Sequence, residues 1–208
     1  DIEVSAVPDS VTEYVKRFAA RRLEDLTVET IDQVSFRRSA LPHQAAAIEG
    51  WIAQGRRGIF EHATGSGKTF TAILAIREQM DLGGAAVVLV PSRLLLEQWA
   101  EELANEIPEA TMLLAGAGHN RWKTSRRLRS MTDCDANLGP RIVLATMPTA
   151  ATQDFLASIS AGDHLLIVAD EVHQIGSPQN SKFLTIEAGK RLGLSATPTR
   201  YGDPDGTA

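Results

Sequence analysis

Short apolar segments alternate with helical patterns along the chain from about residue 40 onward. Most of these segments are rich in Val, Ile, Leu and Ala throughout, as in parallel strands that are covered on both faces. The alternation predicts an α/β fold in three layers, with a mostly parallel sheet and helices on both of its faces. The expected strands are 57–61, 86–90, 111–115, 142–145, 164–169 and 192–194; the expected helices are 43–54, 68–80, 92–106 and 149–160; and residues 181–188 are ambiguous.

Composition excludes several classes of protein. Hydrophobic residues make up 43% of the 208 residues and charged residues 23%, as in globular domains, so wholesale disorder is excluded. The single cysteine, Cys134, excludes an intramolecular disulfide and any zinc or iron–sulfur site built from several cysteines. The longest apolar runs, 85–90 and 165–169, are too short to span a bilayer. We therefore expect an intracellular, cytoplasmic protein without a membrane partner.

A glycine-rich loop, Ala63–Thr69, follows the first expected strand and precedes a helix. Glycines allow backbone N–H groups to turn inward around phosphate oxygens, and the N-terminus of the next helix adds its dipole. Lys68 could reach the β- and γ-phosphates, and the Thr69 hydroxyl could bind Mg²⁺. The general phosphate-loop pattern has Gly at position 62, where this chain has His62. The alternative is a glycine-rich turn with a surface lysine.

Two further expected strands end in polar motifs. Asp170-Glu171-Val172-His173 follows strand 164–169, where the first carboxylate could hold Mg²⁺ and the second could act as general base on a water molecule. Alone, two adjacent acidic residues are more often solvated charges. Ser195-Ala196-Thr197-Pro198 follows the last strand and by itself is typical of a turn.

In their order along the chain, these motifs resemble the first motor domain of superfamily 2 helicases and translocases. The spelling of the acidic motif and the run 191–200 are more similar to restriction-enzyme helicase subunits and XPB-type DNA translocases than to DEAD-box RNA helicases. Leu41 stands where that group often has Arg. The matching segments are Leu41–Gln44 (glutamine motif), Ala63–Thr69 (motif I), Val90–Trp99 (motif Ia), Ala145–Pro148 (a nucleic-acid motif), Asp170–His173 (motif II, a DEAH-box variant) and Leu194–Pro198 (motif III).

The resemblance implies a RecA-like phosphate-loop NTPase fold that uses ATP and Mg²⁺. It implies that Gln44 contacts adenine, that Thr69 and Asp170 hold Mg²⁺, and that Glu171 activates water. The implied triphosphate-binding residues are Thr64, Gly65, Ser66, Gly67, Lys68 and Thr69. The implied catalytic residues are Lys68, Asp170, Glu171 and His173; the implied coupling residues are Ser195 and Thr197, with His173 also taking part; and the implied nucleic-acid contacts are Ser92, Arg93 and Thr146.

The resemblance also implies a domain organisation. It covers roughly residues 36–200, which would form the ATP-binding domain. Residues 1–35 would be an N-terminal helical extension, with an amphipathic helix at 11–25, and residues 201–208 the start of a linker to a second motor domain. In this family the second domain supplies a Q-x-x-G-R-x-x-R motif, which the 208 residues lack.

The expected function is therefore that of the ATP-binding first motor domain of a DNA helicase or translocase. The isolated chain should bind nucleotide and hydrolyse it poorly, because an arginine finger accelerates phosphoryl transfer by about 10³–10⁵ in related systems. DNA is the expected nucleic-acid partner, although the net charge of −5 argues against binding by bulk charge. The alternatives are an RNA helicase of the same superfamily and a nucleotide-dependent scaffold without turnover.

Residues 121–129 hold five basic side chains and one aromatic side chain, Trp122. Cations and a stacking surface together could engage a nucleic-acid strand. The alternative is a solvated loop or short helix. Trp51 and Trp99, which fall in expected helices, are interpreted as core or interface anchors.

Overall fold

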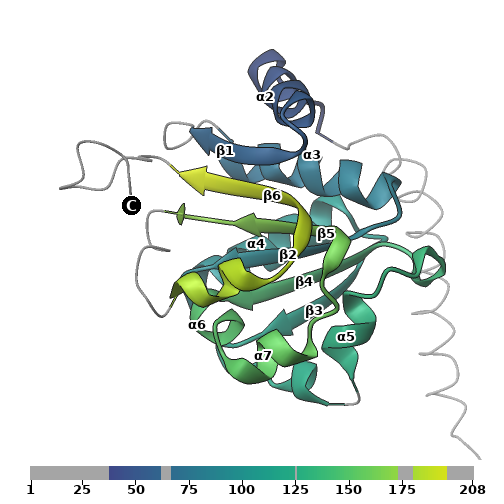
Figure 1. Cartoon of the computed structure of the whole chain (residues 1–208). Coiled ribbons are helices and arrows are strands. Elements are labelled where there is room, and N and C mark those ends of the chain that lie inside the picture. Colours follow the sequence, from purple (N-terminus) through teal and green to yellow (C-terminus); the bar gives the residue numbers. More distant parts are fainter. Residues whose placement is uncertain (1–37, 62–66, 125, 173–179, 196–208) are drawn as a thin grey trace, which may run out of the picture. The chain divides into compact units, whose positions relative to one another are not determined.

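Six parallel strands form a single sheet with helices on both faces (Figure 1). The structure is a computed structural model that describes residues 38–61, 67–124, 126–172 and 180–195. The strand order is β1-β6-β5-β2-β4-β3, and the three-layer α/β prediction is confirmed. The strands are β1 (Arg57–Glu61), β2 (Ala85–Val90), β3 (Thr111–Ala115), β4 (Arg141–Thr146), β5 (Gly162–Ala169) and β6 (Ala188–Ser195).

The helices follow the expected order, with one division that the periodicity did not predict. The expected helix 149–160 is split in two at Ala151–Thr152. The Thr152 hydroxyl accepts a hydrogen bond from Phe155 N at 3.4 Å and so begins a new helix. The helical elements are α2 (Pro42–Ala53), α3 (Lys68–Asp81), α4 (Arg93–Glu106), η1 (Arg121–Lys123), α5 (Arg127–Met131), η2 (Ala136–Leu138), α6 (Met147–Ala150), α7 (Gln153–Ser158) and η4 (Asn180–Thr185).

The sheet separates two hydrophobic cores. Alternate residues of a strand point to opposite faces, so Val88 packs with α3 and α4 while Val87 packs with α5, α6 and α7. All residues of β2 and β4 are buried, which explains why their sequences lack polar alternation. At the β1 end, Trp51 of α2 is buried and its indole N–H donates to Arg191 O of β6 at 3.0 Å.

The register of the sheet brings the loops that carry the motifs to one edge. Glu61 at the end of β1 pairs with Ser195 of β6, and Ala169 at the end of β5 pairs with Gly193. Val90 at the end of β2 pairs with Thr146 of β4. Since the strands are parallel, the connections that leave these ends all start at the same side, where ligands of such sheets bind.

Several sequence predictions fall outside the part of the chain that the structure describes. These are the amphipathic helix 11–25, the N-terminal extension 1–35 and the linker 201–208. Among the described helices, none is long and apolar enough to cross a membrane.

One buried cation holds the connection between β3 and β4. Arg141 is 3% exposed, and its guanidinium donates to three backbone carbonyl oxygens. These belong to Ser130 at 3.0 Å, Asp135 at 2.8 Å and Gly139 at 3.1 Å. A fixed planar fork of donors suits three acceptors at different positions, so Arg141 ties residues 130–139 to the start of the sheet.

We expect Arg141→Met to lower the free energy of unfolding by about 2–4 kcal/mol, because it leaves three carbonyl oxygens without their charged donor. Urea unfolding followed by circular dichroism measures the change. The control is Lys182→Met, which replaces an exposed side chain of η4 and should cost less than about 0.5 kcal/mol. Equal stability of the two variants would contradict this role for Arg141.

Candidate functional site

The start of α2 contacts the residue that opens α3. Gln44 is 3% exposed, and its Nε2 lies 3.4 Å from Gly67 O, to which it donates. Its Oε1 accepts from Leu41 N at 3.0 Å. Gly67 has φ +82°, and a Cβ there would lie 2.7 Å from Gln44 Nε2, so both the backbone conformation and the contact require glycine. The structure thus joins the glutamine motif to the end of the phosphate loop.

The Gln44 amide retains hydrogen-bonding capacity after these two contacts. An amide nitrogen carries two donors and an amide oxygen two lone pairs, and each atom uses one of them here. Counting only partners among the described residues, this leaves one donor and one acceptor, the pair of functions that a purine edge such as that of adenine can match. The adenine contact that the resemblance implies for Gln44 stays a prediction.

Lys68 and Thr69 form the first turn of α3 and are both partly exposed. Lys68 makes no ion pair with any other described residue, so its ammonium group is not neutralised by a carboxylate there. The first turn holds no acidic side chain that would compete for the free N–H groups. This end of a 14-residue helix therefore attracts an anion through its dipole and through Lys68 together.

Asp170 is fixed by three hydrogen bonds at the end of β5. Its backbone N donates to Leu89 O at 2.9 Å. Its Oδ1 accepts from Glu171 N at 2.9 Å, and its Oδ2 accepts from the indole N–H of Trp99 at 2.8 Å. The carboxylate is buried, and it makes no ion pair with another described residue. Neutral donors hold it in place and leave its charge available to a cation.

Trp99 has a role that the sequence analysis did not identify. The side chain is 1% exposed, so the interpretation as a core anchor is confirmed, but its N–H also orients the carboxylate of motif II. Trp99 and Asp170 are 71 residues apart in sequence, on α4 and at the end of β5. A long-range hydrogen bond of this kind has no local sequence signal.

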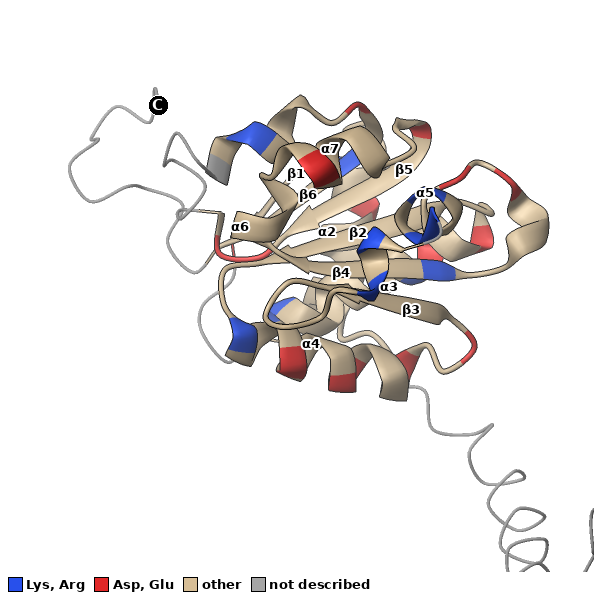
Figure 2. Cartoon of the chain, turned by 90° about the horizontal axis from the view of Figure 1, so that it is seen from below, with Lys and Arg blue, Asp and Glu red and all other residues tan. Residues whose placement is uncertain are grey.

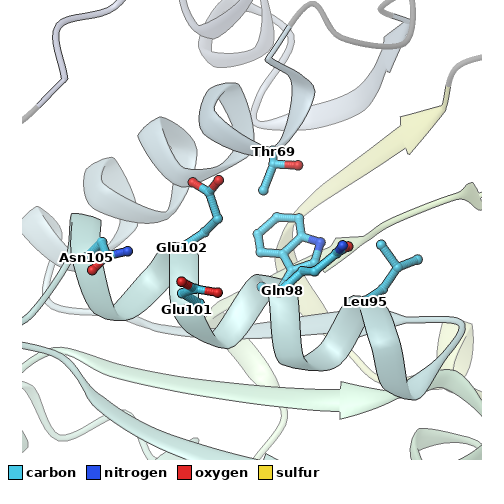
Figure 3. Close-up of a pocket in the computed structure, with 7 residues that line it drawn as sticks. Thr69, Leu95, Gln98, Glu101, Glu102 and Asn105 are labelled. Atoms are coloured by element: carbon cyan, nitrogen blue, oxygen red, sulfur yellow. The ribbon is translucent and has the colours of Figure 1, made fainter.

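A cavity of about 350 Å³ lies between the first turn of α3 and α4 (Figure 3). Two glutamates of its lining, Glu101 and Glu102, are acidic and would repel a triphosphate. The cavity is therefore unsuited to a triphosphate, unlike the N-terminus of α3. Thr69 and Trp99 both line this cavity. Its lining residues are Thr69, Leu95, Gln98, Trp99, Glu101, Glu102 and Asn105.

The oxygen ligands available here fit Mg²⁺. Asp170 supplies a buried carboxylate and Thr69 a hydroxyl group, and Trp99 contacts the first and shares a cavity with the second. The described residues contain no cluster of three or more His, Cys, Asp or Glu that could cage a metal. Mg²⁺ is commonly held by one or two protein oxygens together with phosphate oxygens and water.

Glu171 occupies an uncommon backbone conformation. Its φ is +51°, in the left-handed region that non-glycine residues rarely adopt. The next residue, Val172, packs against β6: a Cβ at Gly193 would lie 2.7 Å from Val172 Cγ1. The small Gly193 therefore lets motif II approach β6, which ends in motif III. Such conformations are held by their surroundings and are frequent at functional sites.

The expected nucleic-acid contacts lie on the neighbouring half of the same edge. Ser92 caps α4 by accepting from Leu95 N at 3.3 Å, and Arg93 is exposed but paired with Glu97 at 2.8 Å. Thr146 ends β4, is 7% exposed, and donates through Oγ1 to Thr149 Oγ1 at 2.9 Å. The strands β2 and β4 end side by side and bring the three to one edge, where Ser92 and Arg93 are exposed and Thr146 is buried.

The remaining predicted residues divide into one that the structure describes and five that it does not. Ser195 ends β6 and is fully buried beside the end of β1. Thr64, Gly65, Ser66, His173 and Thr197 lie outside the described residues, so their roles stay predictions.

The structure contradicts the hypothesis that residues 121–129 offer an aromatic surface for stacking on nucleic acid. Trp122 is 3% exposed, and its ring centroid lies 5.5 Å from that of Phe155. The indole is part of the core and is not available to stack on a base, so that part of the prediction is wrong. The alternative of a short helix is correct: the segment forms η1 and α5.

Comparison with known proteins identifies a family. The family described as "Type III restriction enzyme, res subunit" matches residues 38–200. A DNA 3'-5' helicase, Rad25, of Haloarcula marismortui is 30% identical over 194 residues, which cover 93% of this chain and 28% of the relative. An ATP-dependent RNA helicase, QP509L, of African swine fever virus is 32% identical over 144 residues, or 69% of this chain and 25% of the relative. The chain thus spans about a quarter of these relatives.

Solved structures share the fold. A nuclease-deletion mutant of the Type ISP restriction-modification enzyme LlaGI, in complex with a DNA substrate mimic, has a TM-score of 0.59 at 20% identity and covers 79% of this chain and 18% of its own. The SWI2/SNF2 ATPase core of Sulfolobus solfataricus, in complex with double-stranded DNA, has a TM-score of 0.57 at 20% identity. The match covers 78% of this chain and 33% of that structure's chain. The chain therefore belongs to the family of type III restriction enzyme res subunits, and it shares its RecA-like α/β fold with these solved structures.

Proposed function

We propose that this chain binds ATP with Mg²⁺ and forms one half of the motor of a DNA helicase or translocase. The observation that carries the proposal is the hydrogen bond between Asp170 and Trp99, whose side chain lines a cavity together with Thr69 of the first turn of α3. A phosphate-binding helix start and an oriented carboxylate are the two parts that hold a metal–triphosphate complex in this class of enzymes. The relatives' helicase names and the matched family support the same class of activity.

Each residue then has a chemical role. Gln44 reads the adenine edge with its spare donor and acceptor, while Gly67 and Lys68 bind phosphate oxygens. Thr69 and Asp170 hold Mg²⁺, which would neutralise charge that develops on the phosphates. Glu171, the next residue after Asp170, accepts a proton from the attacking water. A scaffold without turnover would not need this carboxylate.

Hydrolysis by the 208-residue chain should be slow. The printed sequence contains no Q-x-x-G-R-x-x-R motif, and we propose that a second motor domain supplies these arginines. Arginine fingers contribute about 10³–10⁵ to the rate of related phosphoryl transfers. The chain alone should therefore bind nucleotide much better than it turns nucleotide over.

DNA is the proposed nucleic acid, and RNA is the second candidate. The relative Rad25 is named a DNA helicase, and the relative QP509L is named an RNA helicase. The contacts proposed at Ser92, Arg93 and Thr146 would address the backbone, which positions a nucleic acid without reading its sequence. The choice between DNA and RNA therefore depends on which polymer stimulates ATP hydrolysis.

The Lys68→Ala variant tests nucleotide binding. We expect its dissociation constant for ATP to rise by about tenfold or more, because a charged phosphate contact contributes about 1.5–3 kcal/mol. Alanine favours helices, so α3 should be kept. Titration with a fluorescent ATP analogue measures the constant, and Lys182→Ala is the control. Equal affinity of Lys68→Ala and wild type would contradict the proposed phosphate site.

ATP hydrolysis tests the nucleic-acid partner and the missing arginines. We expect the 208-residue chain to hydrolyse ATP slowly with any polymer, and the full-length protein that carries it to be stimulated by DNA. Rates are compared without nucleic acid and with duplex DNA, single-stranded DNA or RNA. Stimulation by RNA alone would favour the second candidate, and brisk Lys68-dependent turnover by the isolated chain would refute the need for a second domain.

The Trp99→Phe variant tests the orientation of Asp170. Phenylalanine keeps most of the buried volume but lacks the N–H, so the carboxylate loses a donor at 2.8 Å. We expect the gain in ATP affinity on adding Mg²⁺ to shrink by about tenfold, with the affinity in EDTA unchanged. Nucleotide titrations with and without Mg²⁺ measure both quantities.

Trp122→Phe is the matched control for Trp99→Phe. Trp122 is also buried, but its N–H has no hydrogen-bond partner among the described residues. Its replacement should therefore leave the Mg²⁺ dependence of nucleotide binding at the wild-type level. If both variants reduced the Mg²⁺ effect equally, the cause would be loss of packing, and the proposed role of the Trp99 N–H would be wrong.

A further inference from the structure

Five basic side chains between β3 and β4 project from a segment that the core holds firmly. Figure 2 shows Lys and Arg positions, drawn in blue, on helix α5. All five are exposed, although the chain as a whole carries a net charge of −5. We call this set the basic surface: Arg121, Lys123, Arg126, Arg127 and Arg129.

Buried side chains anchor the basic surface at both ends. Trp122 packs against Phe155, and Leu128 is 1% exposed in the same core. The Thr132 hydroxyl donates to Leu128 O at 2.9 Å and accepts from Ser160 N at 2.8 Å. The segment is therefore held to α7 and the sheet, and its cations are presented on a fixed support.

No carboxylate pairs with the basic surface among the described residues. The nearest acidic residues in the sequence, Asp133 and Asp135, accept hydrogen bonds from the backbone N–H groups of Asp135 and Asn137. Residues 121–137 keep an excess of three positive charges. The surface consequently attracts an anion from outside this part of the chain.

We propose that the basic surface binds the phosphate backbone of nucleic acid as a second contact area of this motor domain, independent of base sequence. Four of the five cations are arginines, whose planar forks suit phosphate oxygens. The surface offers no exposed aromatic or aliphatic side chain, because Trp122 and Leu128 are buried. Protein interfaces depend on such apolar anchors, whereas a phosphate backbone needs only the cations.

The basic surface is separate from the proposed nucleotide site. It follows β3, which is five strand positions from β1 and three from β5, or roughly 24 Å and 14 Å at about 4.8 Å per strand. It also covers the face of the sheet opposite α3 and α4. Bound nucleic acid could thus touch this area while ATP occupies the strand ends. The inference rests on the proposed function, since it assumes a motor that acts on nucleic acid.

The double variant Arg126→Gln with Arg127→Gln tests the proposal. Fluorescence anisotropy of labelled duplex DNA gives the affinity at several salt concentrations. Each lost phosphate contact should reduce the slope of log K against log salt by about 0.9, so two should reduce it by roughly 1.8. Between about 50 and 200 mM salt, the wild type should then lose roughly tenfold more affinity than the variant. Lys182→Gln, which removes an exposed cation of η4, should keep the wild-type slope.

A further measurement separates this proposal from the proposed function. ATP affinity should be unchanged in the double variant, whereas Lys68→Ala should lower it. An unchanged salt slope in the double variant would overturn the basic surface as a nucleic-acid site. The same conclusion would follow if the wild-type protein did not bind DNA at all. A selective loss of binding to polyglutamate, with DNA affinity retained, would likewise overturn it and indicate an acidic protein partner.

Discussion

The parallel register of the sheet is the constraint on which the rest of the structure depends. Because every described strand pairs in parallel, the ends of β1, β6 and β5 meet at one edge, followed by those of β2 and β4. Motifs that are a hundred residues apart in sequence therefore become neighbours. The residues proposed to bind phosphate and Mg²⁺ follow β1 and β5, and those proposed to contact nucleic acid lie at or just after the ends of β2 and β4. The helix α4 carries Arg93 of the second group and Trp99, which bonds to Asp170 of the first.

The helix α4 joins these two groups of residues physically. Its first residues include the exposed Arg93, and Trp99, less than two turns later, bonds to Asp170. A rigid helix with one end at the proposed nucleic-acid contact and a side chain on the proposed metal ligand gives the two sites a shared element. Coupling between them would require two arrangements of this element, of which the structure describes one.

Polar groups inside the fold are used to position segments and not only to stabilise them. Gln44 holds the start of α2 to Gly67, and Arg141 holds residues 130–139 to the sheet. In each case a buried polar side chain donates to backbone carbonyl oxygens, which costs little when every bond is made and much when one partner is lost. The carboxylate of Asp170 is likewise held in position by hydrogen bonds, which it accepts from Trp99 and Glu171.

The sequence by itself determined the α/β class, the bounds of β1 and β3, and the position of Asp170 directly after a buried strand, because hydrophobic periodicity and glycine-rich turns are local signals. Only the tertiary structure decided the rest. Thr152 splits a helix that periodicity made continuous, Trp122 is buried where an exposed ring was expected, and Trp99 bonds to a residue 71 positions away. These outcomes depend on which side chains the fold brings into contact, and no local pattern contains that information.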